Sequence, residues 1–152
     1  MPEPRLTVTQ RHLPHWTLSG SVYYVTFHLA SGELTETERQ LVSDHVKSGH
    51  GRFYDLAAAT VMPDHVHLIL KPRDGFTLSR ILKGIKGASA RLLNQRRNAT
   101  GRVWQEESWD RILRDPAEFD EKLQYMYNNP VKAGLVVAPD TYDGWFYNPS
   151  FA

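Results

Sequence analysis

Residues 61–70 read Val-Met-Pro-Asp-His-Val-His-Leu-Ile-Leu. The Met-Pro-Asp segment is a turn signal, and the run that follows it, 65–70, is typical of a β-strand. Side chains alternate between the two faces of a strand. Val66, Leu68 and Leu70 therefore share one face, which we expect to pack against helices. His65 and His67 share the other face, which we expect to be the open face of a sheet.

The sequence on either side of this strand predicts further strands and helices. Thr35 and Glu38 form a capping-box pattern, and the Asp-Pro pair at 115–116 is typical of a helix N-terminus. The Asn-Pro pair at 129–130 predicts the end of that helix, because the residue before proline avoids the α conformation. The predicted strands are 22–29, 53–61 and 65–70, the predicted helices are 35–47, 77–95 and 115–129, and a last edge strand is expected near Val103 or at 135–137.

This order of elements predicts an α+β fold, with one antiparallel sheet covered by helices on one face. With 152 residues, the chain is expected to form a single domain over 1–152. We expect its core at about 11–137 and a C-terminal extension at 138–152. We expect residues 142–151 to form an extended arm that packs on the domain or contacts DNA.

The composition excludes several classes of protein. The chain has no cysteine, so disulfides, cysteine-ligated zinc, iron–sulfur clusters and thiol nucleophiles are excluded. No apolar run approaches the 18 or so residues of a membrane-spanning helix. The N-terminus lacks the apolar region of a secretory signal. We therefore expect a cytoplasmic protein with no membrane partner.

Charge is segregated along the chain although the net charge is only +1. Residues 75–104 contain no Asp or Glu, whereas 105–124 are rich in both. The predicted helix 77–95 is therefore basic, which is typical of a nucleic-acid contact, although a solvated helix face gives the same pattern. Candidate contacts with the DNA backbone are Arg80, Lys83, Lys86 and Arg91. His15, Trp16 and Trp104 are candidates for stacking on bases, with core packing equally open for Trp104.

The two histidines of the quoted strand can chelate one metal ion, because they point to the same face. Two unrelated surface histidines would give the same pattern. With no cysteine in the chain, the remaining ligands would be oxygen atoms, which suits Mg²⁺ or Mn²⁺ at a phosphate site, although imidazole also suits Zn²⁺.

Two tyrosines lie near the end of the predicted helix 115–129. On a helical wheel with Phe119 at zero, Leu123 and Met126 form an apolar stripe and Tyr127 lies at its edge. Tyr125 lies at about −120°, off the stripe. Tyr127 is therefore expected to pack in the core. Tyr125 is free to meet a substrate or to pack on another part of the domain.

A free tyrosine, a metal-binding pair and a basic helix together favour one chemistry. A phenolate can attack a DNA phosphate and form a covalent phosphotyrosine. A metal ion would polarise the phosphoryl oxygens, and the basic helix would hold the strand backbone.

Several stretches then carry a resemblance to a known family. The chain is similar to the HUH-type single-tyrosine transposases of bacterial insertion sequences, and more closely to the REP-associated tyrosine transposases. The matching stretches are 11–16, 24–27, 61–68, 82–87, 103–105 with 110–111, and 125–135. Two departures are visible: Asp64 stands where Asn is usual, and Trp109 stands where Phe or Tyr is usual.

The resemblance implies a ferredoxin-like, RRM-like HUH core followed by a helix that carries the nucleophile. It implies His65 and His67 as metal ligands, Tyr125 as the nucleophile and Asn129, one turn later, as a further ligand. Tyr127 remains the rival nucleophile. The implied substrate is single-stranded REP-like hairpin DNA, cut through a 5′-phosphotyrosine intermediate. Monomer and homodimer both stay open, with the monomer favoured.

The sequence therefore predicts a metal-dependent DNA endonuclease and strand transferase, cytoplasmic and associated with the nucleoid through DNA. Two other classes remain open. One is a domesticated transposase that binds DNA without cutting it. The other is a metal-dependent hydrolase built on the histidine pair, which would need several carboxylates nearby and gives Tyr125 no role.

Overall fold

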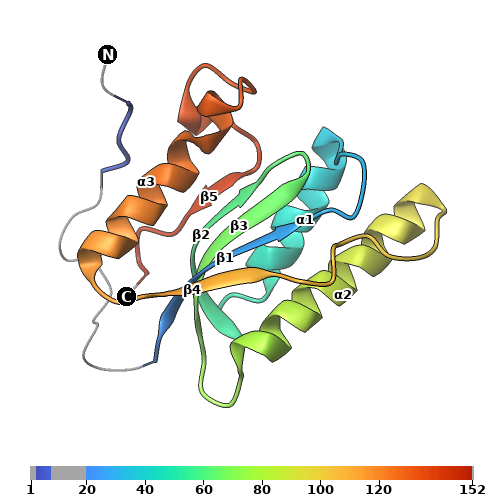
Figure 1. The fold of residues 1–152 in the computed structure, drawn as a ribbon, viewed down its shortest axis with the longest axis horizontal. Helices are drawn as coiled ribbons and strands as arrows, with labels where there is room; N and C mark the ends of the chain where they lie inside the picture. The colour runs from blue at the N-terminus through green and yellow to red at the C-terminus, as the bar shows by residue number, and fades with distance from the viewer. Residues whose placement is uncertain (1–2, 8–19, 152) are drawn as a thin grey trace.

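The computed structural model describes residues 3–7 and 20–151, and the described chain forms one α+β domain (Figure 1). The predicted DNA contacts His15 and Trp16, and the motif at 11–16, lie outside the described residues. The elements are β1 Val22–His28, α1 Glu36–Ser48, β2 Tyr54–Val61, β3 His65–Pro72, α2 Leu78–Arg97, β4 Trp109–Leu113, α3 Pro116–Lys132, a short 3-10 helix Pro139–Thr141 and β5 Trp145–Tyr147.

The five strands form one antiparallel sheet in the order β4-β1-β3-β2-β5. The strand β3 that carries the histidine pair lies at the centre, paired with β1 and β2. The predicted strands and helices are present within a few residues of their expected bounds. The capping box at Thr35 and the Asp115 cap are both formed.

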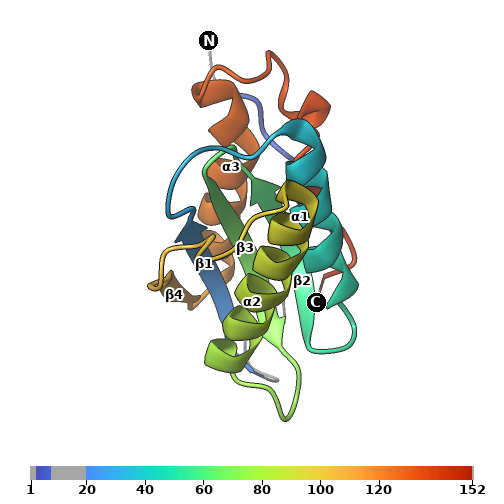
Figure 2. The ribbon, with the colours of Figure 1, turned by 90° about the vertical axis from the view of Figure 1, so that its right-hand side faces the viewer.

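Helices cover both faces of the sheet, so the expectation of an open face is wrong. α1 and α2 lie on one face, and α3 lies on the other (Figure 2). The second face has apolar residues of its own, including Ile69, which pack against Phe119, Leu123 and Met126 of α3. An open face would leave this apolar surface in water.

The edge strands differ from the predicted ones. Neither Val103 nor 135–137 forms a strand, and Trp104 makes only an isolated bridge to Leu29. The two edges are instead β4 and β5. β5 belongs to the C-terminal arm, which packs on the domain: its strand pairs with β2, and Phe151 stacks on Phe119. The extension is thus part of the sheet and of the core.

α3 continues past the predicted stop, because Pro130 lies inside it. A proline cannot donate to the carbonyl four residues earlier, which here is that of Met126. The Thr60 hydroxyl, from β2, donates to this carbonyl oxygen at 3.4 Å. The sheet thus supplies the hydrogen bond that the helix lacks, and α3 runs on to Lys132.

The first described residues lie along α3. The side-chain amide of Gln124 accepts from the Leu6 N–H at 2.8 Å and donates to the Leu6 carbonyl at 2.9 Å. The amide of Asn128 donates to the Pro4 carbonyl at 2.9 Å. Among the described residues, no helix is long and apolar enough to cross a membrane.

Candidate functional site

His65 and His67 lie on the same face of the sheet, as strand alternation predicts, and α3 covers that face instead of leaving it open. Their Nε2 atoms are 3.1 Å apart. His67 is buried, with 5% of its surface exposed, whereas His65 lies nearer the surface. Two ligand nitrogens, each about 2.1 Å from one ion, are about 3.0 Å apart when they meet it at a right angle. The pair therefore has the spacing of two ligands of a single ion.

Each imidazole is oriented through its other nitrogen. The Nδ1 atom of His65 lies 2.7 Å from a carboxylate oxygen of Asp64, to which it can only donate. The Nδ1 atom of His67 lies 3.0 Å from the Tyr24 hydroxyl and 2.9 Å from the Thr26 hydroxyl. With the protons on Nδ1, both Nε2 atoms keep a free lone pair, which is the tautomer that metal ligation through Nε2 requires.

Burial keeps the inner part of the site neutral. Burial, aided by the neighbouring His65 and His28, lowers the pKa of His67 to about 3. Burial also raises the pKa of Tyr24 to about 12, so its hydroxyl keeps its proton. A neutral imidazole is the form that binds a metal.

Tyr125 extends from α3 toward this pair. Its ring centroid is 5.8 Å from that of His67, and 45% of its surface is exposed. Tyr127 is 6% exposed, and its hydroxyl donates to Asp140 at 3.1 Å. Tyr127 is thus a packing residue, as the helical wheel predicts, and the structure brings only Tyr125 of these two to the histidine pair.

Asn129 follows Tyr125 by one helical turn, so both lie on the same side of α3. Its Oδ1 atom is buried and has no hydrogen-bond partner among the described residues. Unsatisfied buried acceptors are uncommon in folded proteins. An amide oxygen is also a ligand type that suits Mg²⁺ or Mn²⁺.

The donor set fits a divalent ion, with two imidazole nitrogens and one free amide oxygen. Within residues 3–7 and 20–151, no group of three or more His, Cys, Asp or Glu side chains is placed to hold a metal. A third protein ligand among these residues would therefore be of another type, such as the amide oxygen of Asn129.

Two lysines of α3 flank Tyr125. The Lys132 ammonium lies 6.0 Å from the centre of the Tyr125 ring and 2.9 Å from Glu3. The Lys122 ammonium lies 5.4 Å from the centre of the Tyr24 ring. Lys122 also lies 3.9 Å from Glu121, so each of the two lysines has an acidic neighbour and lies near an aromatic ring of the site.

Sequence reasoning missed Tyr24, Thr26, Lys122 and Lys132 as parts of this site. Tyr24, Thr26 and His28 are every second residue of β1, and the strand pairs Thr26 with His67 and His28 with His65. The sequence predicts that these three side chains share one face of β1. It does not predict the register that places them next to the histidines.

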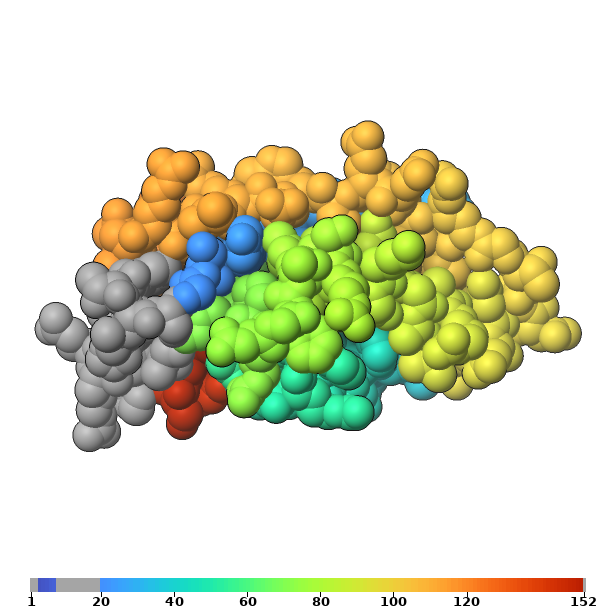
Figure 3. Space-filling view, turned by 90° about the horizontal axis from the view of Figure 1, so that it is seen from below, coloured from blue at the N-terminus to red at the C-terminus, as the bar shows by residue number. Residues whose placement is uncertain are grey.

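The predicted DNA contacts of α2 lie on the opposite side of the sheet. Viewed from below, α2 crosses the surface between the teal segment that includes the end of α1 and the orange segment that includes β4 (Figure 3). Arg80, Lys83 and Arg91 are exposed. The structure therefore does not bring these residues together with the Tyr125 site on one face.

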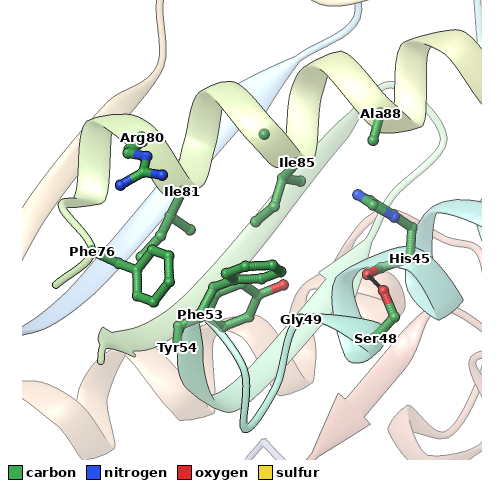
Figure 4. A pocket seen from close by; sticks show the side chains of 11 residues that line it. His45, Ser48, Gly49, Phe53, Tyr54, Phe76, Arg80, Ile81, Ile85 and Ala88 are labelled. Atoms are coloured by element: carbon green, nitrogen blue, oxygen red, sulfur yellow. Dashed lines mark hydrogen bonds between the residues drawn. The ribbon is translucent and has the colours of Figure 1, made fainter. Parts of the chain in front are cut away.

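Arg80 and Lys86 have defined surroundings. The Arg80 guanidinium lies over the Phe76 ring at 5.5 Å, at the rim of a cavity of about 270 Å³ whose wall includes Phe53 (Figure 4). The Lys86 ammonium donates to the carbonyls of Gln105 and Glu106 at 2.7 and 3.0 Å, and it lies 3.0 Å from the Ser108 hydroxyl. Burial lowers its pKa. Lys86 therefore fastens the segment that precedes β4.

Comparison with known proteins gives a consistent result. Residues 29–112 match the family model described as IS200-like transposase. A REP-associated tyrosine transposase of Escherichia coli is 25% identical over 124 residues, which cover 78% of this chain and 72% of that protein. A protein of Haemophilus influenzae that carries the same name provisionally is 25% identical over 130 residues, covering 77% of this chain and 74% of the relative.

A solved structure shares the fold. It is that of a REP-associated tyrosine transposase bound to a REP hairpin, and it superposes with a TM-score of 0.70 at 21% sequence identity. The match covers 100% of this chain and 92% of that one. It therefore includes the sheet with helices on both faces.

Proposed function

Because the chain belongs to the IS200-like transposase family, we propose that it cuts and rejoins single-stranded DNA with Tyr125 as its nucleophile. Membership of a transposase family makes it a DNA-processing enzyme. The proposal adds the reacting residue, the metal ligands and the substrate. The observation that carries it is the approach of the exposed Tyr125 ring to the oriented histidine pair.

His65, His67 and Asn129 would hold the ion, Mg²⁺ or Mn²⁺. When bound, the ion would polarise the phosphoryl oxygens of the scissile bond. The support for this ligand set is the 3.1 Å separation of the two Nε2 atoms and the Asn129 oxygen, which has no hydrogen-bond partner among the described residues. Asp64, Tyr24 and Thr26 orient the imidazoles.

The chemistry is an exchange of one phosphate ester for another. The Oη atom of Tyr125 forms a bond to phosphorus, and the bond from phosphorus to the 3′ oxygen breaks. The phenol loses its proton and the leaving 3′ oxygen gains one. The 5′ phosphate stays on Tyr125, so a free 3′ hydroxyl can reverse the step and join strands without ATP. Lys122 and Lys132 would attract the phosphate to Tyr125.

The substrate in this proposal is hairpin DNA with a single-stranded segment. The solved relative is bound to a REP hairpin, and the basic helix α2 offers contacts for a phosphate backbone. Arg80, Lys83 and Arg91 are exposed and suited to this role. Lys86 instead holds the loop at 105–108.

The decisive test is covalent capture. Hairpin DNA from the repeats flanking the coding region is incubated with the protein and Mg²⁺ or Mn²⁺, then run on a denaturing gel. We expect a nick and a protein–DNA adduct that Tyr125→Phe and His65→Ala abolish and Tyr127→Phe retains. If only Tyr127→Phe abolished the adduct, the proposed chemistry would stand but Tyr127, and not Tyr125, would be the nucleophile. Tight binding without cleavage under either metal would identify a DNA-binding protein that no longer cuts.

A second measurement tests the role of α2. Each phosphate contact adds about 0.9 to the slope of log K against log salt for a duplex. We expect Arg80→Ala to lower this slope by about that amount for hairpin binding, and Lys86→Met to leave it unchanged. Equal slopes for Arg80→Ala and the wild type would remove Arg80 from the DNA contact.

A further inference from the structure

A single row of residues crosses the whole sheet beneath α3. Strand pairing places Trp109 opposite Thr26, Thr26 opposite His67, His67 opposite Thr60 and Thr60 opposite Trp145. Residues paired in this way share one face of the sheet. A tryptophan therefore stands at each edge of the row, and His67 stands at its centre.

The two tryptophans differ in how they are covered. Trp145 contacts the rings of Tyr127 at 5.5 Å and Tyr147 at 6.5 Å, and it is half-buried. Trp109 is 52% exposed, although a tryptophan is normally largely buried. Its ring contact is with Tyr24, at 5.6 Å and nearly perpendicular. Trp109 thus keeps much of its ring open to solvent.

Trp109 nevertheless contacts a residue of the proposed reaction site. Tyr24, which Trp109 meets edge-on, is buried and stacks parallel to His67 at 5.7 Å. Two strand spacings separate Trp109 from His67, which is about 10 Å. That is close enough for one DNA strand to contact both residues.

The surface beside Trp109 suits a nucleic-acid strand. A hollow along the edge strand β4 is bordered by Trp109, Arg111 and Arg114, with Asp110 and Ile112 completing its rim. Arg111 is paired with Glu118, and Arg114 is exposed. An open aromatic ring beside cationic groups is the usual platform for a single strand, because any base can stack on it.

We propose that Trp109 stacks on a base of the single-stranded segment next to the bond that Tyr125 cuts. This rests on the proposed function and adds the binding site of the unpaired nucleotides. Every base has a flat face that can stack on an aromatic ring. This contact therefore positions the strand without selecting its sequence. The phosphates that follow the stacked base would lie toward Lys122 and His67.

The test uses hairpin DNA with a single-stranded extension that carries 2-aminopurine at each position in turn. Stacking on an aromatic ring quenches this fluorescent base. All proteins carry Tyr125→Phe, so binding is measured without cleavage. We expect at least one position to be quenched, and we expect Trp109→Ala to remove that quenching and to weaken binding of the extended hairpin between about 5-fold and 150-fold.

Controls separate stacking from loss of fold. Trp109→Phe keeps a flat ring and should retain most of the quenching. Phe53→Ala removes another exposed aromatic, on the α1 and α2 side, and should leave the quenching unchanged. A hairpin without the extension should bind Trp109→Ala as tightly as the parent protein. Unchanged affinity and unchanged fluorescence in Trp109→Ala would overturn the proposal.

The two proposals fail separately. Absence of any covalent adduct with the wild-type Tyr125 protein contradicts the proposed function, whatever the fluorescence shows. An adduct that forms normally, with fluorescence independent of Trp109, contradicts only the stacking role.

Discussion

Both faces of the sheet are covered by helices, but they are built from different residues. The buried core of the face under α1 and α2 is apolar, with Val25, Phe27, Leu56, Val66, Leu68 and Leu70. The face under α3 combines apolar residues with buried polar ones, namely Tyr24, Thr26, Thr60 and His67. Burying polar groups adds stability only when their hydrogen bonds are made. The face under α1 and α2 thus contributes mainly to the stability of the fold. The face under α3 contributes less to stability, because it also positions the polar residues of the candidate site.

The largest effect is expected on the apolar face. Leu68→Ala should lower the free energy of unfolding by about 2–5 kcal/mol, because Leu68 is fully buried and its truncation leaves a cavity. Urea unfolding measures the loss. Mn²⁺ binding by the folded protein should be unchanged, since Leu68 points away from the histidines. A large loss of Mn²⁺ affinity in the folded variant would show that the two faces are not independent.

An intermediate effect is expected beside the histidines. Asp64→Ala removes the acceptor that orients His65 and should weaken Mn²⁺ binding by about 10-fold to 100-fold. Asp64→Asn should lose less Mn²⁺ affinity than Asp64→Ala, because an amide oxygen still accepts a hydrogen bond from Nδ1 of His65. Isothermal titration calorimetry measures both. Asp55→Ala is the matched control, since Asp55 pairs with Arg73 on the surface. Equal affinities for Asp64→Ala and Asp55→Ala would contradict the orienting role.

The smallest effect is expected where α3 meets the polar face. Thr60→Val removes the donor to the Met126 carbonyl and should cost about 0.5–1.5 kcal/mol of stability. In a Pro130→Ala background the helix regains its own donor, so the same change should cost less. Thermal unfolding of the four proteins gives the coupling energy. A cost that is the same in both backgrounds would mean that Thr60 does not replace the missing helix bond.

Local sequence rules predicted much of this molecule. The caps at Thr35 and Asp115, the alternation along β3 and the different burial of Tyr125 and Tyr127 each depend on neighbours a few residues apart. What the sequence alone left out depends on distant pairing. Which residue of β1 faces His67, and which face α3 covers, follow from strand register and packing. Pro130 misled because the hydrogen bond that lets the helix continue comes from Thr60, 70 positions earlier in the chain.

The Thr60 hydroxyl and Pro130 together fix the position of α3 along its own axis relative to the sheet. An apolar stripe alone allows a helix to slide along a sheet, because residues one turn apart present similar surfaces, and one turn is about 5.4 Å. Pro130 frees one particular carbonyl, that of Met126, and only one axial position brings it to Thr60. Thr60 is also the strand partner of His67. The hydrogen bond that fixes the helix position therefore also places Tyr125, the residue before Met126, beside His67.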